Sequence, residues 1–522
     1  MESLRGPPGP MLPEQQAALR QPCRGSSDRI GPDDPRYADL AGKRFNKRFS
    51  GNPDYVRLAG STEQVVEALE EAVREGLRVV ARSGGHCLEG FVADPAVKVV
   101  IDTSLMNAVY YDSDMDAFAV EAGATVGEMV RKLCLGWGVT VPAGESPDIG
   151  VGGHVLGGAF GFLCREYGLA ADHLYGVEVV VVDADGTARR VVATREPSDP
   201  NHDLWWAHTG GGGGNFGIVT RYWFRSPGAV GSDPAQLLPK VPETVLTFRV
   251  AWSWEDIDAA AFTKLTRNFG TWCEENSEPG TPSARLFRTL FLWRRQAGKL
   301  EMRGLSTAGA EAQRLVSEHV AAINDGVGAP HTFDVERSSW LGFALDPFPE
   351  LFRAGQGDAL LKGKDAFLRR RFTDRQLELA HDYLTRTDHD VPGGMLGMVT
   401  YGGQVNAVAP DATASAQRDS VLSTSCMAGW QDPGDEAPML AWVRAFYRDL
   451  FADTGGVPVP GELADGAMIN HPDTDLADPE WNTSGVPWHE LYYKDNYPRL
   501  QRVKARWDPG NVFHHALSIP AT

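Results

Sequence analysis

The chain has 522 residues, of which 42% are apolar and 23% charged, and it contains 57 glycines and 34 prolines. This composition excludes a disordered chain, a collagen-like repeat and a bare coiled coil, and it indicates a large globular protein of two or three domains. Fifty basic against 69 acidic residues give a formal net charge of −19, which disfavours nucleic acid and anionic membranes as partners.

The N-terminus shows no targeting or membrane signal. Residues 1–23 contain Gly-Pro and Pro-Gly steps and no apolar stretch of the length a secretory signal needs. No later run approaches the roughly 20 apolar residues that span a bilayer. We therefore expect a cytoplasmic protein in which about the first 30 residues are flexible.

The first 225 residues are predicted to alternate between strands and helices. One helix is predicted to begin after Ser61, which forms a capping box with Gln64, and to end at Gly76. A second helix is predicted to begin after Thr125, which forms a capping box with Glu128. Short strands are predicted within 77–86, 97–102 and 116–123. The apolar run 177–182 is typical of a strand covered on both faces, and the turn 183–186 returns the chain into 188–194.

A change of composition after residue 227 indicates a second domain. Pro-rich loops precede a block with amphipathic stretches at 260–275 and 439–456. The stretch from about residue 456 is loop-rich and aromatic. We predict three segments, with boundaries at 1–228, 229–455 and 456–522.

Three glycine clusters stand out, at 82–86, 150–161 and 209–217. Glycine allows a close backbone approach, so these loops could hold a diphosphate with N–H groups and without cationic side chains. None has the spacing of a Walker loop or of a GxGxxG motif. Bulges and tight turns are the alternative explanation.

The runs ARSGGHCLEG (81–90), GVGGHVLGGAFG (150–161), DLWWAHTGGGGGNFGIVT (203–220) and YYKDNYPRLQRVKARWDPGNVF (492–513) resemble the berberine-bridge-enzyme-like flavin oxidases of the vanillyl-alcohol-oxidase superfamily. The similarity is strongest to the actinobacterial antibiotic-biosynthesis subgroup of glycopeptide hexose oxidases, aclacinomycin and gilvocarcin oxidoreductases and tirandamycin oxidase. It implies an α+β fold: a PCMH-type FAD-binding domain, completed by the C-terminal segment, and a substrate domain built on a large antiparallel sheet.

The resemblance also implies how FAD is held. His86 matches the histidine that is joined to the 8α-methyl group of FAD, although a turn imidazole is the alternative. Most relatives carry a second link through a cysteine 60 residues further on, where this chain has Ser146. A serine cannot form that thioether, so we expect FAD to be bound covalently through His86 only.

The remaining cofactor contacts are transferred from the matching motifs. They are Arg82, Ser83, Gly84, Gly85, Cys87, Gly150, Gly152, Gly153, His154, Gly157, Gly158, Gly213, Gly214, Asn215, Gly217, Ile218, Val219, Tyr493, Asn496 and Asn511. Cys87, Cys134 and Cys164 are expected to be buried small hydrophobic residues. The six scattered cysteines, with no CxxC pair, predict no zinc site, and His154, His514 and His515 lack the neighbours that a metal site needs.

Relatives place a tyrosine over the flavin to accept the substrate's hydroxyl proton. Tyr492 is our first candidate and Tyr493 the second. Neighbours on an extended chain face opposite sides, so only one of them could point at the ring. Both could instead be core-packing aromatics. Phe160 and Cys426 stand where relatives carry tyrosines, so both are expected in the substrate pocket wall, and Tyr401 is a third candidate.

The implied function is oxidation of an alcohol, or a similar C–H donor, on a bulky secondary metabolite in antibiotic biosynthesis, with dioxygen reduced to hydrogen peroxide. Oxidation of a sugar or glycopeptide hexose is an alternative within this class. A flavoprotein without net oxidation, acting as a cyclase scaffold or a drug-binding self-protection protein, is an alternative from another class. We expect a monomer or homodimer.

Overall fold

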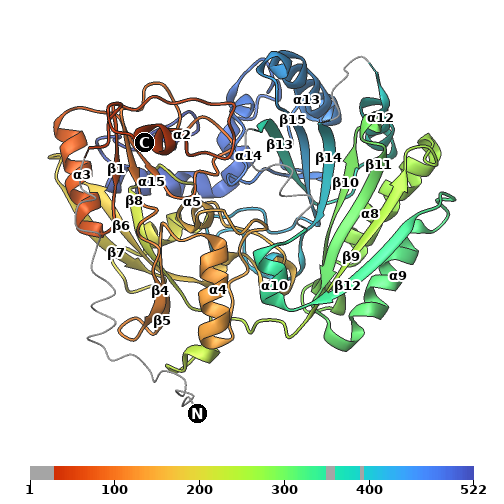
Figure 1. Ribbon diagram of the computed structural model, residues 1–522, viewed down its shortest axis with the longest axis horizontal. Coiled ribbons are helices and arrows are strands. Elements are labelled where there is room, and N and C mark those ends of the chain that lie inside the picture. Colours follow the sequence, from red (N-terminus) through yellow and green to blue (C-terminus); the bar gives the residue numbers. More distant parts are fainter. Residues whose placement is uncertain (1–28, 349–358, 388–392, 522) are drawn as a thin grey trace, which may run out of the picture.

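The computed structural model describes residues 29–348, 359–387 and 393–521. The flexible segment predicted for about the first 30 residues lies, except for residues 29 and 30, outside this range. Two lobes stand side by side (Figure 1). The combination of helices with mainly antiparallel sheets confirms the predicted α+β class.

The N-terminal lobe contains two sheets. A three-stranded parallel sheet has the order β1-β3-β2, and a five-stranded antiparallel sheet has the order β4-β5-β8-β6-β7. Their strands are β1 (Tyr55–Leu58), β2 (Val79–Arg82), β3 (Val99–Asp102), β4 (Val109–Asp112), β5 (Ala117–Glu121), β6 (Leu174–Val182), β7 (Ala188–Thr194) and β8 (Ile218–Phe224). The helices of this lobe are α2 (Tyr37–Gly42), α3 (Thr62–Arg74), α4 (Val126–Trp137), α5 (Val151–Leu156), α6 (Cys164–Tyr167) and α7 (His202–Ala207).

The predicted helix starts are confirmed. Thr125 caps α4 with a complete capping box, in which Glu128 returns the bond to the Thr125 N–H. Ser61 caps α3 by accepting from the Gln64 N–H. The Gln64 side chain instead accepts from the Gly60 N–H, so this box is only half formed. Gly76 follows α3 with a φ of +66°, as expected for a helix end.

Strand β6 is the centre of the N-terminal lobe. Eight of its nine residues are buried, all except Tyr175, and the side chains of Val177 to Val182 that alternate along the strand belong to two different core clusters. It pairs with β7 through the predicted turn and with β8 on its other edge. The expectation of a strand covered on both faces is therefore confirmed.

The second lobe is built on one eight-stranded antiparallel sheet. Its order is β12-β9-β11-β10-β14-β15-β13-β16. The strands are β9 (Val245–Ser253), β10 (Leu286–Trp293), β11 (Lys299–Ser306), β12 (Thr332–Ser338), β13 (Leu360–Leu368), β14 (Gly394–Thr400), β15 (Leu422–Trp430) and β16 (Ala464–Gly466). The helices are α8 (Ala259–Glu275), α9 (Ala312–Asn324), α10 (Trp340–Leu345), α12 (Asp374–Thr385) and α13 (Glu436–Leu450). Helices α8 and α9 lie on the side of the sheet away from the N-terminal lobe (Figure 1), and α12 packs on both α8 and α13.

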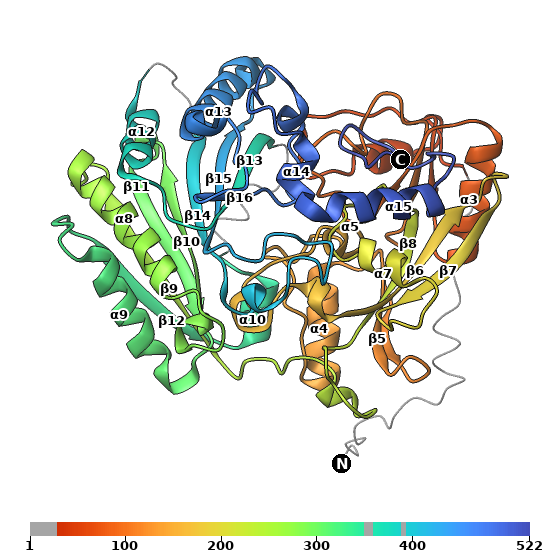
Figure 2. The same cartoon turned by 180° about the vertical axis from the view of Figure 1, so that it is seen from behind.

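The C-terminal segment joins the two lobes. It contributes the edge strand β16 to the large sheet and then forms α14 (Trp488–Tyr493) and α15 (Tyr497–Trp507). Helix α15 runs back across the N-terminal lobe, where it packs on α7 (Figure 2). Among the described residues, no helix has the length and apolar character that crossing a membrane requires.

Candidate active site at the seam of the two lobes

Four segments meet at the seam: the turn after β2, the turn leading into α5, the loop 209–217, and the segment 467–475. Gly84 and Gly150 pack backbone to backbone, because a Cβ on Gly84 would lie 2.3 Å from the Gly150 nitrogen. Gly212 donates its N–H to the Leu156 carbonyl at the end of α5. The glycines of the three predicted clusters thus bring these loops into direct contact.

Backbone without side chains is exposed where α5 meets the loop 209–217. Gly153, Gly213 and Gly214 are exposed although most of their neighbours in α5 and in the loop are buried. A Cβ on Gly153 would meet no atom within 4 Å. Exposed peptide groups without side chains form a cradle of the kind that holds a diphosphate in an acidic protein.

His86 and Ser146 lie on two turns that touch. The His86 ring stacks on Phe45, with ring centroids 4.9 Å apart. Burial lowers the pKa of His86, which favours the neutral imidazole, and the charge of Asp148 opposes this shift. Ser146, two residues before Asp148, makes no side-chain hydrogen bond to any described residue.

Several predicted cofactor residues use their side chains to hold the loops. Arg82 forms an ion pair with Asp102 at 2.8 Å, and the Ser83 hydroxyl donates to the Ala122 carbonyl. The Asn215 amide donates to the carbonyls of Gly211 and Gly212, and Asn496 donates to Pro410 and Thr413. These side chains fix the loops, which leaves the backbone as the surface for a cofactor.

The other predicted glycines and the β8 residues also shape the backbone. The Gly152 carbonyl accepts from the Tyr222 hydroxyl, Gly85 has a φ of +78°, and Gly217 packs against β6. Ile218 and Val219 are buried at the start of β8. Asn511 adopts a φ of +50° in the turn after α15.

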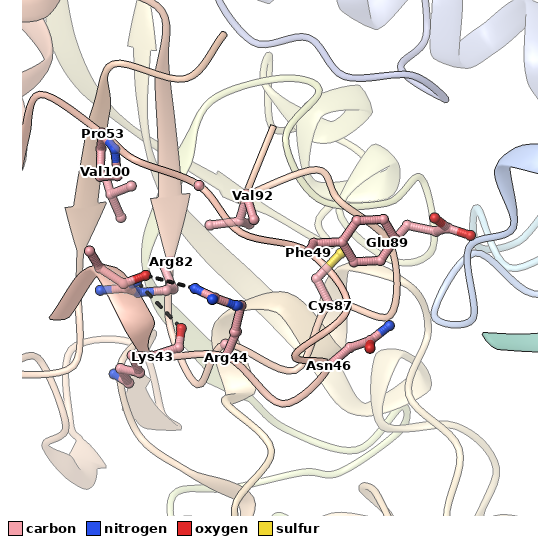
Figure 3. A pocket seen from close by; sticks show the side chains of 14 residues that line it. Lys43, Arg44, Asn46, Phe49, Pro53, Arg82, Cys87, Glu89, Val92 and Val100 are labelled. Carbon is pink, nitrogen blue, oxygen red and sulfur yellow. Dashed lines mark hydrogen bonds between the residues drawn. The ribbon is translucent and has the colours of Figure 1, made fainter. Parts of the chain in front are cut away.

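The predicted burial of the cysteines is only partly correct. Cys164 is fully buried, whereas Cys87 and Cys134 are half-buried. Cys87 lines a pocket beside the His86 turn, across from Arg82 and Arg44 (Figure 3). Burial raises the pKa of the Cys87 thiol to about 11, so it stays protonated at neutral pH.

The histidines considered as metal ligands have other contacts. His154 accepts from the Gly144 N–H at 2.9 Å, and burial lowers its pKa to about 3. His515 stacks on Phe91 and hydrogen-bonds the Gly213 carbonyl. Within the described residues, no three His, Cys, Asp or Glu side chains gather as metal ligands would.

The three candidate tyrosines are fully enclosed. Tyr492 and Tyr493 lie on the helix α14, so the expectation of an extended chain was wrong, and both are buried. The Tyr492 oxygen accepts from the Asp473 N–H at 2.9 Å, and the Tyr493 hydroxyl donates to the Gly211 carbonyl at 3.0 Å. Tyr401 is also buried. Burial raises the pKa of all three phenols well above the usual value.

The two predicted pocket-wall residues lie apart. Phe160 faces the seam, and its ring contacts Phe367 and Tyr401 edge-on. Cys426 pairs across the strands with Lys364, whose ammonium lies over the ring of Tyr447 in α13. The structure therefore places Cys426 on the α13 side of the sheet and Phe160 on the other side.

Sequence reasoning missed a cluster of titratable groups beside Phe160. The rings of His471 and Phe160 are 6.0 Å apart, and the Nδ1 atom of His471 lies 3.5 Å from the Oδ2 atom of Asp365. Glu145 is near enough to act on the His471 charge. Only a histidine in a loop between β16 and the aromatic segment signalled this cluster, because Asp365 is far away in the sequence.

Comparisons with known proteins agree with this architecture. Residues 53–191 match the FAD binding domain family, and residues 467–520 match the berberine and berberine-like family. The chain is 50% identical to aclacinomycin-N/aclacinomycin-A oxidase of Streptomyces galilaeus over 99% of this chain and 94% of that protein.

Solved structures show the same fold. A crystal structure of aclacinomycin oxidoreductase has a TM-score of 0.91 at 50% identity and covers 95% of this chain and 99% of its own. Glycopeptide hexose oxidase DBV29, complexed with teicoplanin, has a TM-score of 0.90 at 49% identity and covers 94% and 98%. The chain belongs to the berberine-bridge-enzyme-like FAD-dependent oxidoreductases, in the group that contains the actinobacterial antibiotic-biosynthesis oxidases.

Proposed function

We propose that the protein oxidises an alcohol carbon of a bulky secondary metabolite and passes the electrons to dioxygen, which gives hydrogen peroxide. The observation that carries this proposal is the cradle of exposed backbone at Gly153, Gly213 and Gly214, with His86 on the adjoining turn. These residues fit FAD, since the cradle offers peptide N–H groups and the turn offers an imidazole. When bound there, FAD supplies a two-electron acceptor.

We propose that His86 alone links FAD covalently. Its lowered pKa supports this role, because only the neutral imidazole has a free lone pair for a bond to carbon. Stacking on Phe45 fixes the plane of the ring. Ser146 cannot provide a second link, so one bond is expected where relatives have two.

The seam also has the character of a substrate pocket. Phe160 lies beside the partly exposed His471, with Phe367 and Tyr401 buried behind it, so its ring offers an apolar contact for an aromatic or polyketide skeleton. Glycopeptide hexose oxidase DBV29, at 49% identity, supports a sugar hydroxyl as the second candidate group. In both candidate substrates, the reacting alcohol is part of a much larger molecule.

Turnover and peroxide measurements test the proposed reaction. Purified yellow protein is mixed without oxygen with a panel of polyketide alcohols and glycosylated antibiotics, and bleaching of the flavin absorbance is followed. We expect bleaching by at least one compound and one peroxide per carbonyl formed after air is admitted. A binding or scaffold protein would shift the flavin spectrum with these compounds and release no peroxide.

The covalent link has its own test. In acid-precipitated wild type, the flavin should stay with the pellet, because the bond survives unfolding. In His86→Ala it should be released completely into the supernatant. His331→Ala, at an exposed position in the other lobe, is the control and should retain its flavin. Retention of the flavin by His86→Ala would disprove the link.

A further inference from the structure

His471 stands at the seam with one face open. Its side chain is 39% exposed, whereas the candidate tyrosines are at most 2% exposed. Nδ1 faces Asp365, and Nε2 forms no hydrogen bond to the parts of the chain that the structure describes. Nδ1 of the imidazole therefore contacts Asp365, whereas Nε2 is available to a ligand beside the ring of Phe160.

Asp365 is arranged to hold this imidazole. It is buried to 2% exposure on β13, and its Oδ2 lies 3.5 Å from His471 and 3.4 Å from the Met468 N–H. Its Oδ1 has no hydrogen-bond partner among the described residues. A buried carboxylate that lacks hydrogen bonds lowers the stability of the folded protein. A functional role therefore explains Asp365 better than a role in packing.

The loop that carries His471 is tied to the cofactor side of the seam. The Asn470 side chain accepts from the Ala159 N–H at 3.0 Å and donates to the His154 carbonyl at 2.9 Å. These two bonds join the residue before His471 to the end of α5 and to the residue before Phe160. The imidazole is therefore held at a fixed place against the predicted cofactor loop.

We propose that His471 Nε2 accepts the hydroxyl proton of the substrate alcohol, and that Asp365 orients the ring and stabilises the imidazolium that forms. This rests on the proposed function. The O–H bond breaks as the C=O bond forms, and the hydrogen on carbon leaves with two electrons for FAD. Dioxygen then takes up these electrons with two protons, one of them the proton that His471 had accepted, and gives hydrogen peroxide.

The buried phenols compare poorly with His471 as proton acceptors. A phenol must ionise before it can accept a proton, and burial raises the pKa of Tyr401, Tyr492 and Tyr493. The Tyr492 oxygen is also engaged by the Asp473 N–H. A neutral imidazole accepts a proton near pH 7 without prior ionisation, which is the range in which a general base is most effective.

The charges around His471 set the direction of its pH dependence. Burial lowers its pKa, but the hydrogen bond and charge of Asp365, together with the charge of Glu145, outweigh burial, and the net pKa is raised. His154, on α5, stays neutral over the working range. The rate of flavin reduction should rise with pH as His471 loses its proton, with a midpoint above about 6.5, the value for free histidine.

The first test compares His471→Gln with His331→Gln in the intact, flavin-loaded protein. Gln keeps the size and polarity of the side chain but cannot act as a base at neutral pH. We expect anaerobic flavin reduction to slow by roughly 10²–10⁴ in His471→Gln, the usual effect of losing a general base. His331→Gln should stay within twofold of wild type. Both variants should keep their full flavin content.

The second test follows the imidazole itself by NMR of the flavin-loaded protein labelled with ¹³C at histidine Cε1. The resonance missing from the His471→Gln spectrum should titrate with a pKa above about 6.5. Asp365→Asn should lower that pKa and move the acid limb of the rate profile in the same direction. A merely structural role of Asp365 would change neither value.

Two results would overturn the proposal. One is a loss of less than tenfold in His471→Gln, and the other is a His471 resonance that does not respond to Asp365→Asn. If no alcohol in the panel reduces even the wild type, the proposed function fails and the acceptor role fails with it. Failure of the proposed function would thus appear in the wild type, whereas failure of the acceptor role alone would appear only in the comparison of His471→Gln with an active wild type.

Discussion

Strand β13 carries charged side chains on both of its faces, and the two faces differ in how these charges are satisfied. On the face toward α13, Lys362 and Lys364 are almost completely buried. Lys362 lies 2.6 Å from Asp473, and Lys364 lies 2.9 Å from Asp475. Glu89, from the N-terminal lobe, also pairs with Lys362, so this network fastens the two lobes together.

On the opposite face of the same strand, the charge is incompletely satisfied. Asp365 has one oxygen without a partner among the described residues, and its other oxygen makes only long contacts, to His471 and to the Met468 N–H. The segment 467–475 reaches both faces, with His471 on one and Asp473 on the other. The network of Lys362, Lys364 and their carboxylates therefore holds the segment in place, while the pair of His471 and Asp365 keeps its capacity to take up a proton.

The largest expected effect comes from breaking the saturated network. Asp473→Ala leaves two buried ammonium groups short of a partner, and breaking a buried ion pair costs about 3–5 kcal/mol. Asp365→Asn should change the free energy of unfolding by less than about 1 kcal/mol, since it removes a poorly satisfied charge. Urea unfolding of both variants, with flavin bound, measures the difference. Equal losses would show that the two faces are energetically alike.

A smaller effect is expected from Tyr492→Phe, which removes the oxygen that accepts the Asp473 N–H. An unsatisfied buried N–H costs about 1–3 kcal/mol, so the variant should be less stable. Its anaerobic flavin reduction should fall by less than tenfold. A fall beyond 10² with unchanged stability would move the proton-accepting role from His471 to Tyr492. Tyr497→Phe, in the neighbouring helix, is the control for altered aromatic packing.

Much of the fold could be predicted from short-range sequence features. The capping residues Ser61 and Thr125, the apolar run of β6 and the turn into β7 each depend on neighbours in the chain, and all four features are confirmed. The sequence motifs also led to the correct family. Helix α14, which includes Tyr492, was missed because it is only six residues long and its N-cap is Pro487, which has no capping side chain.

The active-site cluster depends on tertiary contacts and left no local pattern. Asp365 is in the middle of a strand and His471 in a loop more than a hundred residues later, and only the crossing of the segment 467–475 brings them together. Cys426 was expected in the substrate pocket wall with Phe160, but its side chain lies on the other face of the sheet, toward α13. Which face a strand residue occupies depends on the register of the strand, and the sequence alone does not fix that register. The division at residues 228 and 455 and the cofactor contacts stay predictions.

The smallest expected effect distinguishes the two faces by their response to pH. Burial raises the pKa of Glu145, beside His471, to about 7, whereas the pKa of Asp475 in the ion-pair network is lowered, since Arg444 and the lysines outweigh burial. A carboxyl with a raised pKa makes the folded protein bind more protons than the unfolded chain, so its contribution to stability is lost as pH rises from about 4.5 to about 7. Asp475 acts oppositely and loses its contribution in acid. Glu145→Gln should therefore remove about 1 kcal/mol of the stability loss between pH 5 and 8, after screening by solvent, as measured by urea midpoints across that range. An unchanged slope would mean that burial does not raise the pKa of Glu145 in the folded protein.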